Sequence, residues 1–288
     1  VDIKILHEVL SISQKEKCLQ IKNLLSGEIF SDSYDKLIIA TGANPSIPPI
    51  KGVDKENVFS LRNINDMNKI KAFIDKNSPK SAAIIGTGFI GLEMCENLKN
   101  LGIEVSLIEK LPHVTPGLDF DMAVYVKDEI EKNGVKVYLN AAIKEIEENA
   151  VILSDGTKIV ADMILIAAGV RPNTSLAKLA GIELGGFGGI KVDSMMRTNI
   201  PDIYACGDCI EQFHLVTGKP VYRPLGSTAN KTGRIAGDAA TGGNLEFRGI
   251  LGTGIFKIFD MTVAQTGLSE REAREHGYDV QVCHNIKP

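Results

Sequence analysis

The clearest chemical pattern in this sequence is a glycine run, Gly-Thr-Gly-Phe-Ile-Gly, at residues 86–91. In a dinucleotide-binding turn of this spacing, the first glycine, Gly86, makes the tight bend, and the second, Gly88, lets a pyrophosphate approach the backbone. The third, Gly91, lets the following helix pack closely on the preceding strand. Unpaired N–H groups at the start of that helix favour phosphate oxygens. The run therefore predicts a dinucleotide site, against the alternative of a glycine turn that binds nothing.

The sequence around this run favours the dinucleotide. A buried strand at 82–85 precedes the glycines and a helix at 90–100 follows them. A second strand, at 105–108, ends at Glu109, which lies 18 residues after the last glycine (109 − 91). Strand, glycine turn, helix, strand and acidic residue in this order are the parts of a dinucleotide-binding βαβ unit.

Glu109 also predicts which dinucleotide is bound. A carboxylate at this position can accept hydrogen bonds from the ribose hydroxyls and would repel a 2′-phosphate. We therefore expect NADH to bind more tightly than NADPH, although the nearby Lys110 and His113 would reduce that difference.

The five cysteines form no disulfide framework in a chain of 288 residues. Cys206 and Cys209 have the C-x-x-C spacing of a redox dithiol or of half a zinc site. Cys206, however, takes the place of a buried apolar residue in a strand, and the sequence has no second C-x-x-C pair. We therefore interpret both as structural thiols and predict no metal. Cys95, on the helix after the glycine run, is interpreted in the same way.

Composition excludes several classes of function. The chain is 44% hydrophobic and 24% charged, with a net charge of −4 and no basic block, so we expect no nucleic-acid partner. No apolar run approaches the ~18 residues of a membrane span. The opening residues do not resemble a signal peptide, and the cysteine usage favours a reducing, cytoplasmic compartment.

The remaining elements alternate as in a parallel sheet with a small antiparallel addition. We expect a strand at 18–21 to pair with one at 27–30, and strands within 142–157 to be joined at Asp155-Gly156. Further strands are expected at 37–40, where both faces would be buried, at 135–139 and at 163–167. Helices are expected at 64–74 and 119–132, and Gly134 would end the second of them in a left-handed cap.

The second half of the chain also alternates between expected strands and helices. Residues 181–189 are interpreted as a turn, followed by a strand at 190–192 and a strand at 203–206 that ends in Gly207-Asp208. A helix is expected at 227–240, with Ser227 or Thr228 as N-cap, and a strand at 255–259 would begin a further domain.

Four patterns together carry a family resemblance. They are Ala-Thr-Gly at 40–42, the glycine run at 86–91, Ala-Ala-Gly-Val-Arg-Pro-Asn at 167–173 and Tyr-Ala-Cys-Gly-Asp at 204–208. Each is weak alone, but their order and spacing resemble those of the pyridine nucleotide-disulfide oxidoreductases over nearly the whole chain. Residues 60–63 and 215–234 are most similar to coenzyme A-disulfide reductases, with NADH oxidases and NADH peroxidases as close relatives.

The resemblance implies where NAD would bind. The implied contacts are Gly86, Gly88, Phe89, Ile90, Gly91, Glu109, Gly169 and Val170. Phe89 stands where relatives carry an aromatic gate over the flavin, with ordinary packing as the alternative. Glu93 matches a carboxylate near the nicotinamide pocket, with a solvated helix face as the alternative.

The resemblance also implies an FAD site and a substrate contact. The implied FAD contacts are Thr41, Gly42, Ala43, Arg62, Gly207, Asp208, Leu225, Gly226, Ser227 and Ala229. Asp208 would hydrogen-bond a ribityl hydroxyl, and residues 225–229 would bring a helix N-terminus, with its partial positive charge, to the pyrimidine end of the flavin. Asn230 falls where coenzyme A-disulfide reductases contact substrate.

The sequence lacks several parts of the family pattern. The family begins with an FAD-binding strand–GxGxxG–helix and carries its redox cysteine some tens of residues later, and neither is found in this chain. We expect an α/β fold with a Rossmann-like NAD-binding domain at 78–172. It would be inserted in an incomplete FAD domain made of 1–77 and 173–245, and the start of a truncated C-terminal interface (dimerisation) domain would follow at 246–288.

The implied activity is transfer of a hydride from NADH to FAD, then by a cysteine absent from this chain to a disulfide or persulfide such as coenzyme A disulfide. The full-length protein would be a homodimer, and this chain alone would be inactive. One alternative is an NADH oxidase or peroxidase that uses oxygen or peroxide. An alternative of another class is a non-catalytic nicotinamide-binding fragment.

Overall fold

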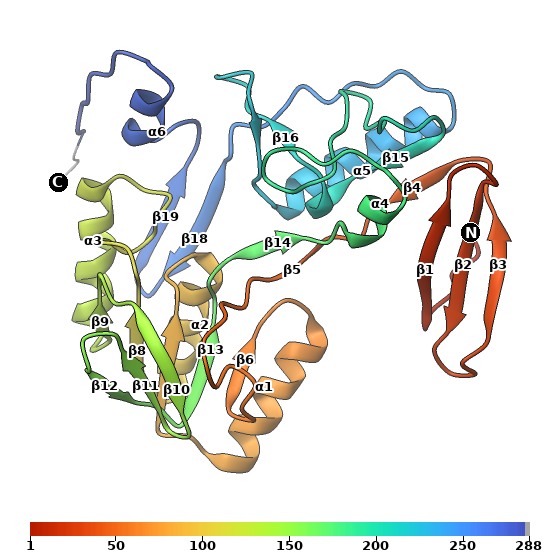
Figure 1. Ribbon diagram of the computed structural model, residues 1–288. Coiled ribbons are helices and arrows are strands. Elements are labelled where there is room, and N and C mark those ends of the chain that lie inside the picture. Colours follow the sequence, from red (N-terminus) through yellow and green to blue (C-terminus); the bar gives the residue numbers. More distant parts are fainter. Residues whose placement is uncertain (286–288) are drawn as a thin grey trace. The chain divides into compact units, whose positions relative to one another are not determined.

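A computed structural model describes residues 1–285, and the chain divides into two compact units (Figure 1). Unit 1 joins residues 1–44 with 171–251, and unit 2 joins residues 45–170 with the described residues from 252 to 285. Both contain helices and strands, so the fold is mixed α/β, as predicted.

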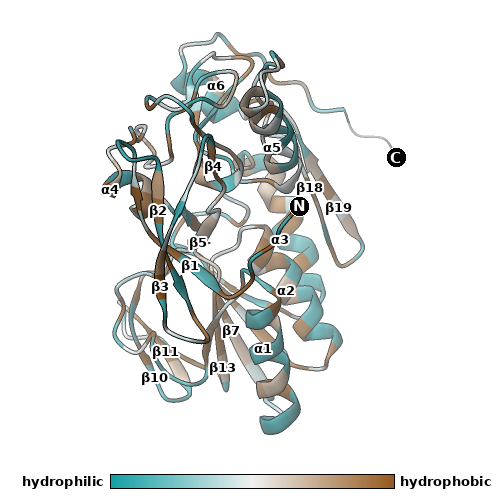
Figure 2. Cartoon of the chain, turned by 90° about the vertical axis from the view of Figure 1, so that its right-hand side faces the viewer, coloured by the Kyte–Doolittle hydropathy of each residue, from teal (hydrophilic) through white to brown (hydrophobic). Residues whose placement is uncertain are grey.

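Unit 2 is built on a five-stranded parallel sheet in the order β6-β13-β7-β8-β9. The strands are β6 (Val58–Ser60), β13 (Met163–Ile166), β7 (Ser81–Ile85), β8 (Glu104–Ile108) and β9 (Lys136–Tyr138). Its helices are α1 (Ile64–Asn77), α2 (Phe89–Asn100) and α3 (Phe120–Lys132). Every residue of β13 is buried, as expected of a central parallel strand covered on both faces. Figure 2 shows hydrophilic residues interspersed with hydrophobic ones along α1 and α2, which is typical of helices that bury one face.

Unit 2 also contains a separate three-stranded antiparallel sheet. It consists of β10 (Ile143–Glu147), β11 (Ala150–Leu153) and β12 (Lys158–Val160). The predicted turn at Asp155-Gly156 is present, with Gly156 at φ +90°, but it joins β11 to β12. The strands β10 and β11 are joined earlier, at 148–149, so the predicted range of this hairpin was wrong. Gly134 adopts the left-handed conformation predicted after α3, with φ +73°.

The last described part of unit 2 is a hairpin followed by a short helix: β18 (Gly254–Ile258), β19 (Met261–Gln265) and α6 (Glu270–Glu275). Phe256 and Ile258 are buried in the same core as Leu92 of α2 and Val126 of α3. The backbone N–H groups of the hairpin turn donate to helix carboxylates, from residue 259 to Glu96 at 3.0 Å and from residue 260 to Glu129 at 3.3 Å. The hairpin is therefore fixed to α2 and α3 by both apolar and polar contacts.

Unit 1 contains a three-stranded antiparallel sheet, a short parallel pair and two helices. Its elements are β1 (His7–Ser13), β2 (Cys18–Asn23), β3 (Ile29–Ser33), β4 (Leu37–Ile39), β15 (Ile203–Ala205), β16 (Gln212–Phe213), β17 (Pro220–Val221), α4 (Ser175–Leu179), α5 (Gly226–Ala240) and a 3-10 turn at Gly207–Cys209. The predicted pairing of 18–21 with the strand after the turn is confirmed, with Ile21 opposite Phe30, but that strand is 29–33 and not 27–30. β4 runs parallel to β15, with Ile39 opposite Ala205. The short strands β5 (Ala43–Pro45) and β14 (Val170–Pro172) pair with each other.

Two predictions about unit 1 were wrong. The strand β4 is not buried on both faces, because the side chain of Ile38 is 40% exposed while Ile39 is buried. The helix α5 does not begin with Ser227 or Thr228 as N-cap, because Leu225 takes the extended cap conformation and no side chain caps the helix. Thr228 is instead buried within the first turn.

The glycine-rich residues 185–189 are turn structure, as predicted, but the strand predicted at 190–192 is absent. Ile190 forms only single bridges, to Leu184 and Ile210. The turn packs around the side chain of Glu211, which is 6% exposed and accepts a hydrogen bond from the N–H of residue 187 at 2.6 Å. A Cβ added at Gly185 would overlap the Glu211 carboxylate. These glycines are therefore explained by packing around a buried carboxylate.

The two units divide the chain differently from the predicted domains. Residues 45–77 belong to unit 2 because β6 pairs with β13, and the hairpin after 252 belongs to it because β18 packs on α2. The domain assignment of 1–77, 78–172, 173–245 and 246–288 stays a prediction. Within residues 1–285, none of the helices has the length and apolar character needed to cross a membrane.

Candidate functional site

The glycine run of unit 2 forms the turn between β7 and α2. Gly86 has φ +101°, and a Cβ there would lie 2.5 Å from the carbonyl oxygen of Ala167. A Cβ at Gly91 would collide with the carbonyl oxygen of Gly86. Around Gly88, in contrast, no atom lies within 4 Å of an added Cβ. The first and third glycines are thus required by the chain itself, whereas the second faces open space, where a ligand can approach.

The N-terminus of α2 has no side chain that caps it. Gly88 is the N-cap residue, with extended φ −74° and ψ −179°. At α1, by comparison, Asn63 and Asp66 form a complete capping box. The first N–H groups of α2 therefore remain available for a phosphate, whose charge the helix dipole also favours.

The carboxylate of Glu109 lies directly behind this turn. It is 5% exposed, and its Oε2 accepts hydrogen bonds from the N–H of Thr87 at 3.1 Å and from Thr87 Oγ1 at 2.8 Å. Its Oε1 accepts from the N–H of Leu111 at 3.0 Å. Glu109 therefore fixes the glycine turn to the end of β8 as well as standing at the position predicted for ribose recognition.

Parallel pairing brings the predicted NAD residues to one edge of the sheet. β7, β8 and β13 are neighbours, so the loops after their carboxyl ends meet, which is where α/β proteins bind nucleotides. The loop after β13 contains Gly169 at φ +92°, followed by Val170 in β14. The N–H of Ala167 donates to the carbonyl of Ile85 at 2.8 Å, which joins this loop to the glycine turn.

The two accessory residues on α2 differ in their surroundings. Phe89 is half-buried, and its ring packs on that of Phe256, with 5.0 Å between centroids and 34° between planes. Glu93 is exposed on the same helix. The packing of Phe89 agrees with the alternative weighed for it, while a gate role for Phe89 and a pocket role for Glu93 stay predictions.

Unit 1 brings together three of the segments predicted to border FAD. Since β4 and β15 are parallel neighbours, residues 41–43 and 206–208 follow them at the same edge. The N–H of Cys206 donates to the carbonyl of Ile39 at 3.0 Å. An added Cβ at Gly207, whose φ is +79°, would lie 3.8 Å from that of Ala229 on α5. The turn carrying Asp208 therefore lies against the first turn of α5.

The uncapped start of α5 resembles that of α2. Leu225 is the N-cap residue and offers no hydrogen-bonding side chain. Thr232, almost two turns into the helix, accepts a hydrogen bond at its Oγ1 from the N–H of Gly207 at 3.1 Å. Tyr222 donates its hydroxyl to the carbonyl of Asp208 at 2.9 Å. The turn at 207–208 is thus held from both sides.

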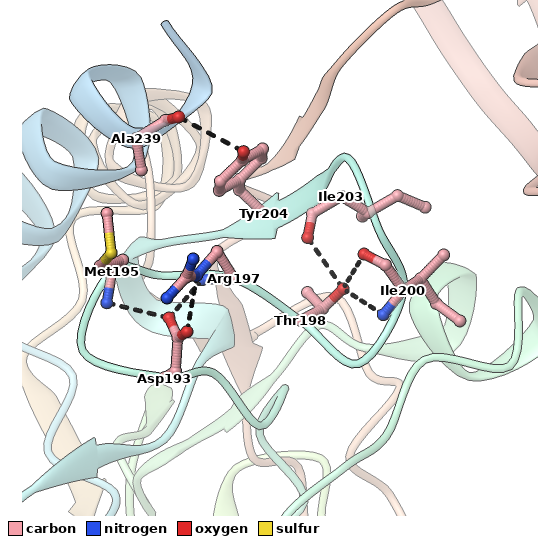
Figure 3. A network of polar contacts seen from close by, with 8 residues as sticks. All are labelled: Asp193, Met195, Arg197, Thr198, Ile200, Ile203, Tyr204 and Ala239. Carbon is pink, nitrogen blue, oxygen red and sulfur yellow. Dashed lines mark hydrogen bonds and ion pairs between the residues drawn. The ribbon is translucent and has the colours of Figure 1, made fainter. Parts of the chain in front are cut away.

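A polar network supports the strand that leads into this turn (Figure 3). Tyr204, in β15, donates its hydroxyl to the carbonyl of Ala239 near the end of α5 at 3.3 Å. On the loop before β15, Asp193 accepts from the N–H of Arg197 at 2.9 Å and from its Nε at 2.7 Å. Thr198 Oγ1 donates to the carbonyl of residue 203 at 2.8 Å. β15 is therefore tied to both its preceding loop and α5.

The buried cysteines are poor candidates for redox or metal chemistry. Burial raises the pKa of Cys206 to about 11 and that of Cys95 to about 12, and it also raises the pKa of Cys209. The thiol of Cys209 lies 3.2 Å from the carbonyl of Cys206 and 3.6 Å from that of Ile39. Within residues 1–285, no group of three His, Cys, Asp or Glu side chains is placed to hold a metal ion.

Two predicted site residues stand apart from these groups. Arg62 belongs to unit 2, where its N–H donates to Asp66 at 3.0 Å beside the cap of α1, so it is not grouped with the unit 1 segments. Asn230 is exposed, one residue beyond Ala229 on α5. Their roles toward FAD and substrate stay predictions.

Three contacts of the site were not expected from the sequence. Thr87 was not singled out, although a hydroxyl inside the glycine run could have suggested a partner for Glu109. Thr232 and Phe256 carried no local signal, because their contacts with residues 207 and 89 join segments far apart in the sequence.

A family model and several known proteins match this chain. The model of the pyridine nucleotide-disulphide oxidoreductases matches residues 1–225. An NADH oxidase of Methanocaldococcus jannaschii is 40% identical over 91% of this chain and 58% of that protein. A coenzyme A disulfide reductase of Staphylococcus haemolyticus is 32% identical over 97% of this chain and 63% of that protein. The chain thus spans about three fifths of the length of these relatives.

Solved structures match both units. Reduced Bacillus anthracis CoADR-RHD has a TM-score of 0.94 and 41% identity, and the match covers 97% of this chain and 51% of that one. A NAD-dependent persulfide reductase from A. fulgidus has a TM-score of 0.92 and 40% identity, over 95% of this chain and 51% of that one.

Proposed function

Because this chain belongs to the pyridine nucleotide-disulphide oxidoreductase family, a family of oxidoreductases, we propose that it is the nicotinamide- and part of the flavin-binding portion of an NADH-dependent flavoenzyme that reduces a disulfide or persulfide. The observation that carries the proposal is the turn at 86–91, with an open Gly88, an uncapped helix and a buried carboxylate at Glu109. These features would supply a phosphate site and a ribose acceptor at one edge of the sheet.

Glu109 supports NADH over NADPH. Its carboxylate is held by Thr87 and Leu111 and cannot swing away without breaking those hydrogen bonds. A 2′-phosphate would place negative charge beside it. His113 is poorly placed to pair with that phosphate, because its ring is buried and its Nδ1 lies 2.8 Å from the carbonyl of Val114.

The unit 1 segments fit the ribityl and pyrimidine parts of FAD. Asp208 follows β15 on a turn held by Thr232 and Tyr222, and the uncapped start of α5 lies against that turn. FAD, when bound, would accept a hydride from the nicotinamide and pass on its electrons. The residues of this chain would bind and orient it, and the α5 dipole would stabilise negative charge on the reduced ring.

The acceptor is proposed from the relatives. Proteins named coenzyme A disulfide reductase, NAD(P)H sulfur oxidoreductase (CoA-dependent) and NAD-dependent persulfide reductase all match most of this chain. We propose that the electron acceptor is a disulfide or persulfide such as coenzyme A disulfide. The longer protein that contains this chain would be a homodimer. The second candidate is an NADH oxidase that reduces oxygen, favoured by the name of the 40% identical relative.

The proposal is tested in two stages. First, NADH and NADPH are titrated into the 288-residue chain alone, and saturable binding with NADH the tighter ligand is expected; equal or tighter NADPH binding would contradict the assignment of Glu109. Second, the longer protein that contains this chain is purified and mixed anaerobically with NADH, which should bleach its flavin absorbance. Re-oxidation by coenzyme A disulfide, by persulfide or by oxygen then separates the two candidate functions, and a flavin that NADH does not bleach would refute both.

A further inference from the structure

The β18–β19 hairpin of unit 2 contacts Phe89, one of the residues that the family resemblance implies as NAD contacts. Phe89 is the first residue of α2 and directly follows Gly88, the open glycine of the turn. Its ring packs on Phe256 of β18 at 5.0 Å between centroids. A Cβ added at Gly254, also in β18, would lie 2.9 Å from Cζ and 3.0 Å from Cε2 of the same ring. The ring is thus bounded by two residues of one strand.

The hairpin that supplies these residues is well fixed. Phe256 is 5% exposed within the core shared by α2 and α3, and Ile258, two residues further along the strand, is fully buried. The turn of the hairpin is bonded to Glu96 and Glu129. A strand held in this way provides a firm surface for the Phe89 ring. The absence of a side chain at Gly254 is what lets the ring lie so close to it.

We infer that Gly254 and Phe256 are positioning residues for nicotinamide binding, because they hold the Phe89 ring next to Gly88, the open glycine of the turn. The inference rests on the proposed function and extends it to a segment that lies more than 150 residues away in the sequence (254 − 89 = 165). A ring with a fixed position loses little conformational freedom when a ligand packs against it, whereas a freed ring must be ordered on binding. The hairpin would therefore contribute to NADH affinity without touching NADH.

Gly254→Ala is the direct test. The atoms that the new methyl group meets are the far end of the Phe89 side chain, so the ring should move while the fold stays intact. Phe256→Leu is the second variant, since it keeps an apolar side chain in the core but removes the ring contact. The matched control is Gly237→Ala in α5, where no atom lies within 4 Å of the added Cβ.

Two readouts follow the ring and the ligand. The chain contains no tryptophan, so Phe89→Trp gives a single indole at this position. In that background, Gly254→Ala and Phe256→Leu should shift the emission maximum of the free chain, and Gly237→Ala should not. With Phe89 retained, both variants should raise the NADH dissociation constant about fivefold, because a ring that Gly254→Ala displaces or Phe256→Leu frees must be repositioned and ordered when NADH binds.

The decisive step is a double-mutant cycle with Phe89→Ala. If Gly254 acts through the ring, Gly254→Ala should change NADH binding little once the ring is gone. A loss of affinity that persists in the Phe89→Ala background, or unchanged affinity in the single variants, would overturn the inference and leave the proposed function standing. A native chain that does not bind NADH would overturn both.

Discussion

The buried carboxylate of Glu109 accepts two hydrogen bonds from Thr87, one from its N–H at 3.1 Å and one from its hydroxyl at 2.8 Å. Thr87 is the residue between the first two glycines of the turn, so the acidic residue and the phosphate loop form one rigid group. Recognition of the ribose and of the pyrophosphate is therefore expected to be coupled.

The first prediction follows from this pair. Thr87→Val removes a hydroxyl that donates to a charged group and keeps the shape of the side chain. Such a bond contributes about 1.5–3 kcal/mol, so NADH affinity should fall roughly tenfold or more as the turn loses its anchor. Thr87→Ser, which keeps the hydroxyl, is the matched control. Calorimetric titration of both variants checks this; equal affinities for Val and Ser would show that the hydroxyl is dispensable.

The second prediction concerns Glu109 itself. Glu109→Gln removes the negative charge and keeps one oxygen, which can accept from Thr87, so the turn should survive, although the amide nitrogen cannot accept from the N–H of Leu111. We expect NADPH binding to improve relative to NADH binding, by about tenfold in the ratio of dissociation constants. Glu109→Ala should weaken both ligands, because it also releases the turn. A Gln variant that retains the full preference of the native chain would assign the discrimination to other residues.

The third prediction concerns the thiols. Burial raises the pKa of Cys206 to about 11 and of Cys95 to about 12, so both stay protonated near neutral pH, where a thiol must ionise to react. Cys283 is exposed. Iodoacetamide followed by peptide mass spectrometry should therefore label Cys283 first and Cys95 and Cys206 only in denaturant. Rapid labelling of Cys206 in the folded chain would restore the dithiol interpretation.

The fourth prediction concerns acid stability of unit 2. Burial alone would raise the pKa of Asp162, but the N–H groups of Lys80 and Ser81 and the Ser81 hydroxyl donate to it and hold its pKa below the usual value. A carboxyl with a lowered folded pKa stabilises the fold above its unfolded pKa of about 4, and that contribution is lost as the pH falls through the folded pKa. Urea unfolding should show Asp162→Asn less stable at neutral pH, with the difference shrinking in acid. A difference that does not depend on pH would contradict this account.

The fifth prediction tests the support of β15. Tyr204→Phe removes the hydroxyl that bonds the carbonyl of Ala239 and leaves the ring in place. The expected loss of unfolding free energy is about 1 kcal/mol, the usual contribution of one such bond. Denaturant titration checks the value, and Tyr222→Phe, which removes the bond to the Asp208 carbonyl, serves for comparison.

The sequence predicted the parts of this molecule that depend on neighbours along the chain. The β7–turn–α2 unit and the cap at Gly134 follow from local spacing and backbone geometry. The exposure of Ile38 could not be predicted, because burial of a strand face depends on what covers it. The start of α5 was misplaced because Ser227 and Thr228 are both good caps, and local preference did not decide the start. The grouping of Arg62 with unit 2 depends on the long-range pairing of β6 with β13.

The packing of the 185–189 turn around Glu211 has an evolutionary consequence. A side chain at Gly185 and a full-length acidic side chain at 211 cannot occupy the same space, and a Cβ at Gly189 would lie 2.8 Å from the backbone nitrogen of residue 211. A substitution at 185 therefore requires a shorter residue at 211 in the same protein. A side chain at 189 would meet main-chain atoms, and no substitution at 211 removes those. Among homologues, positions 185 and 211 should therefore vary together, while 189 should stay glycine whatever residue 211 becomes.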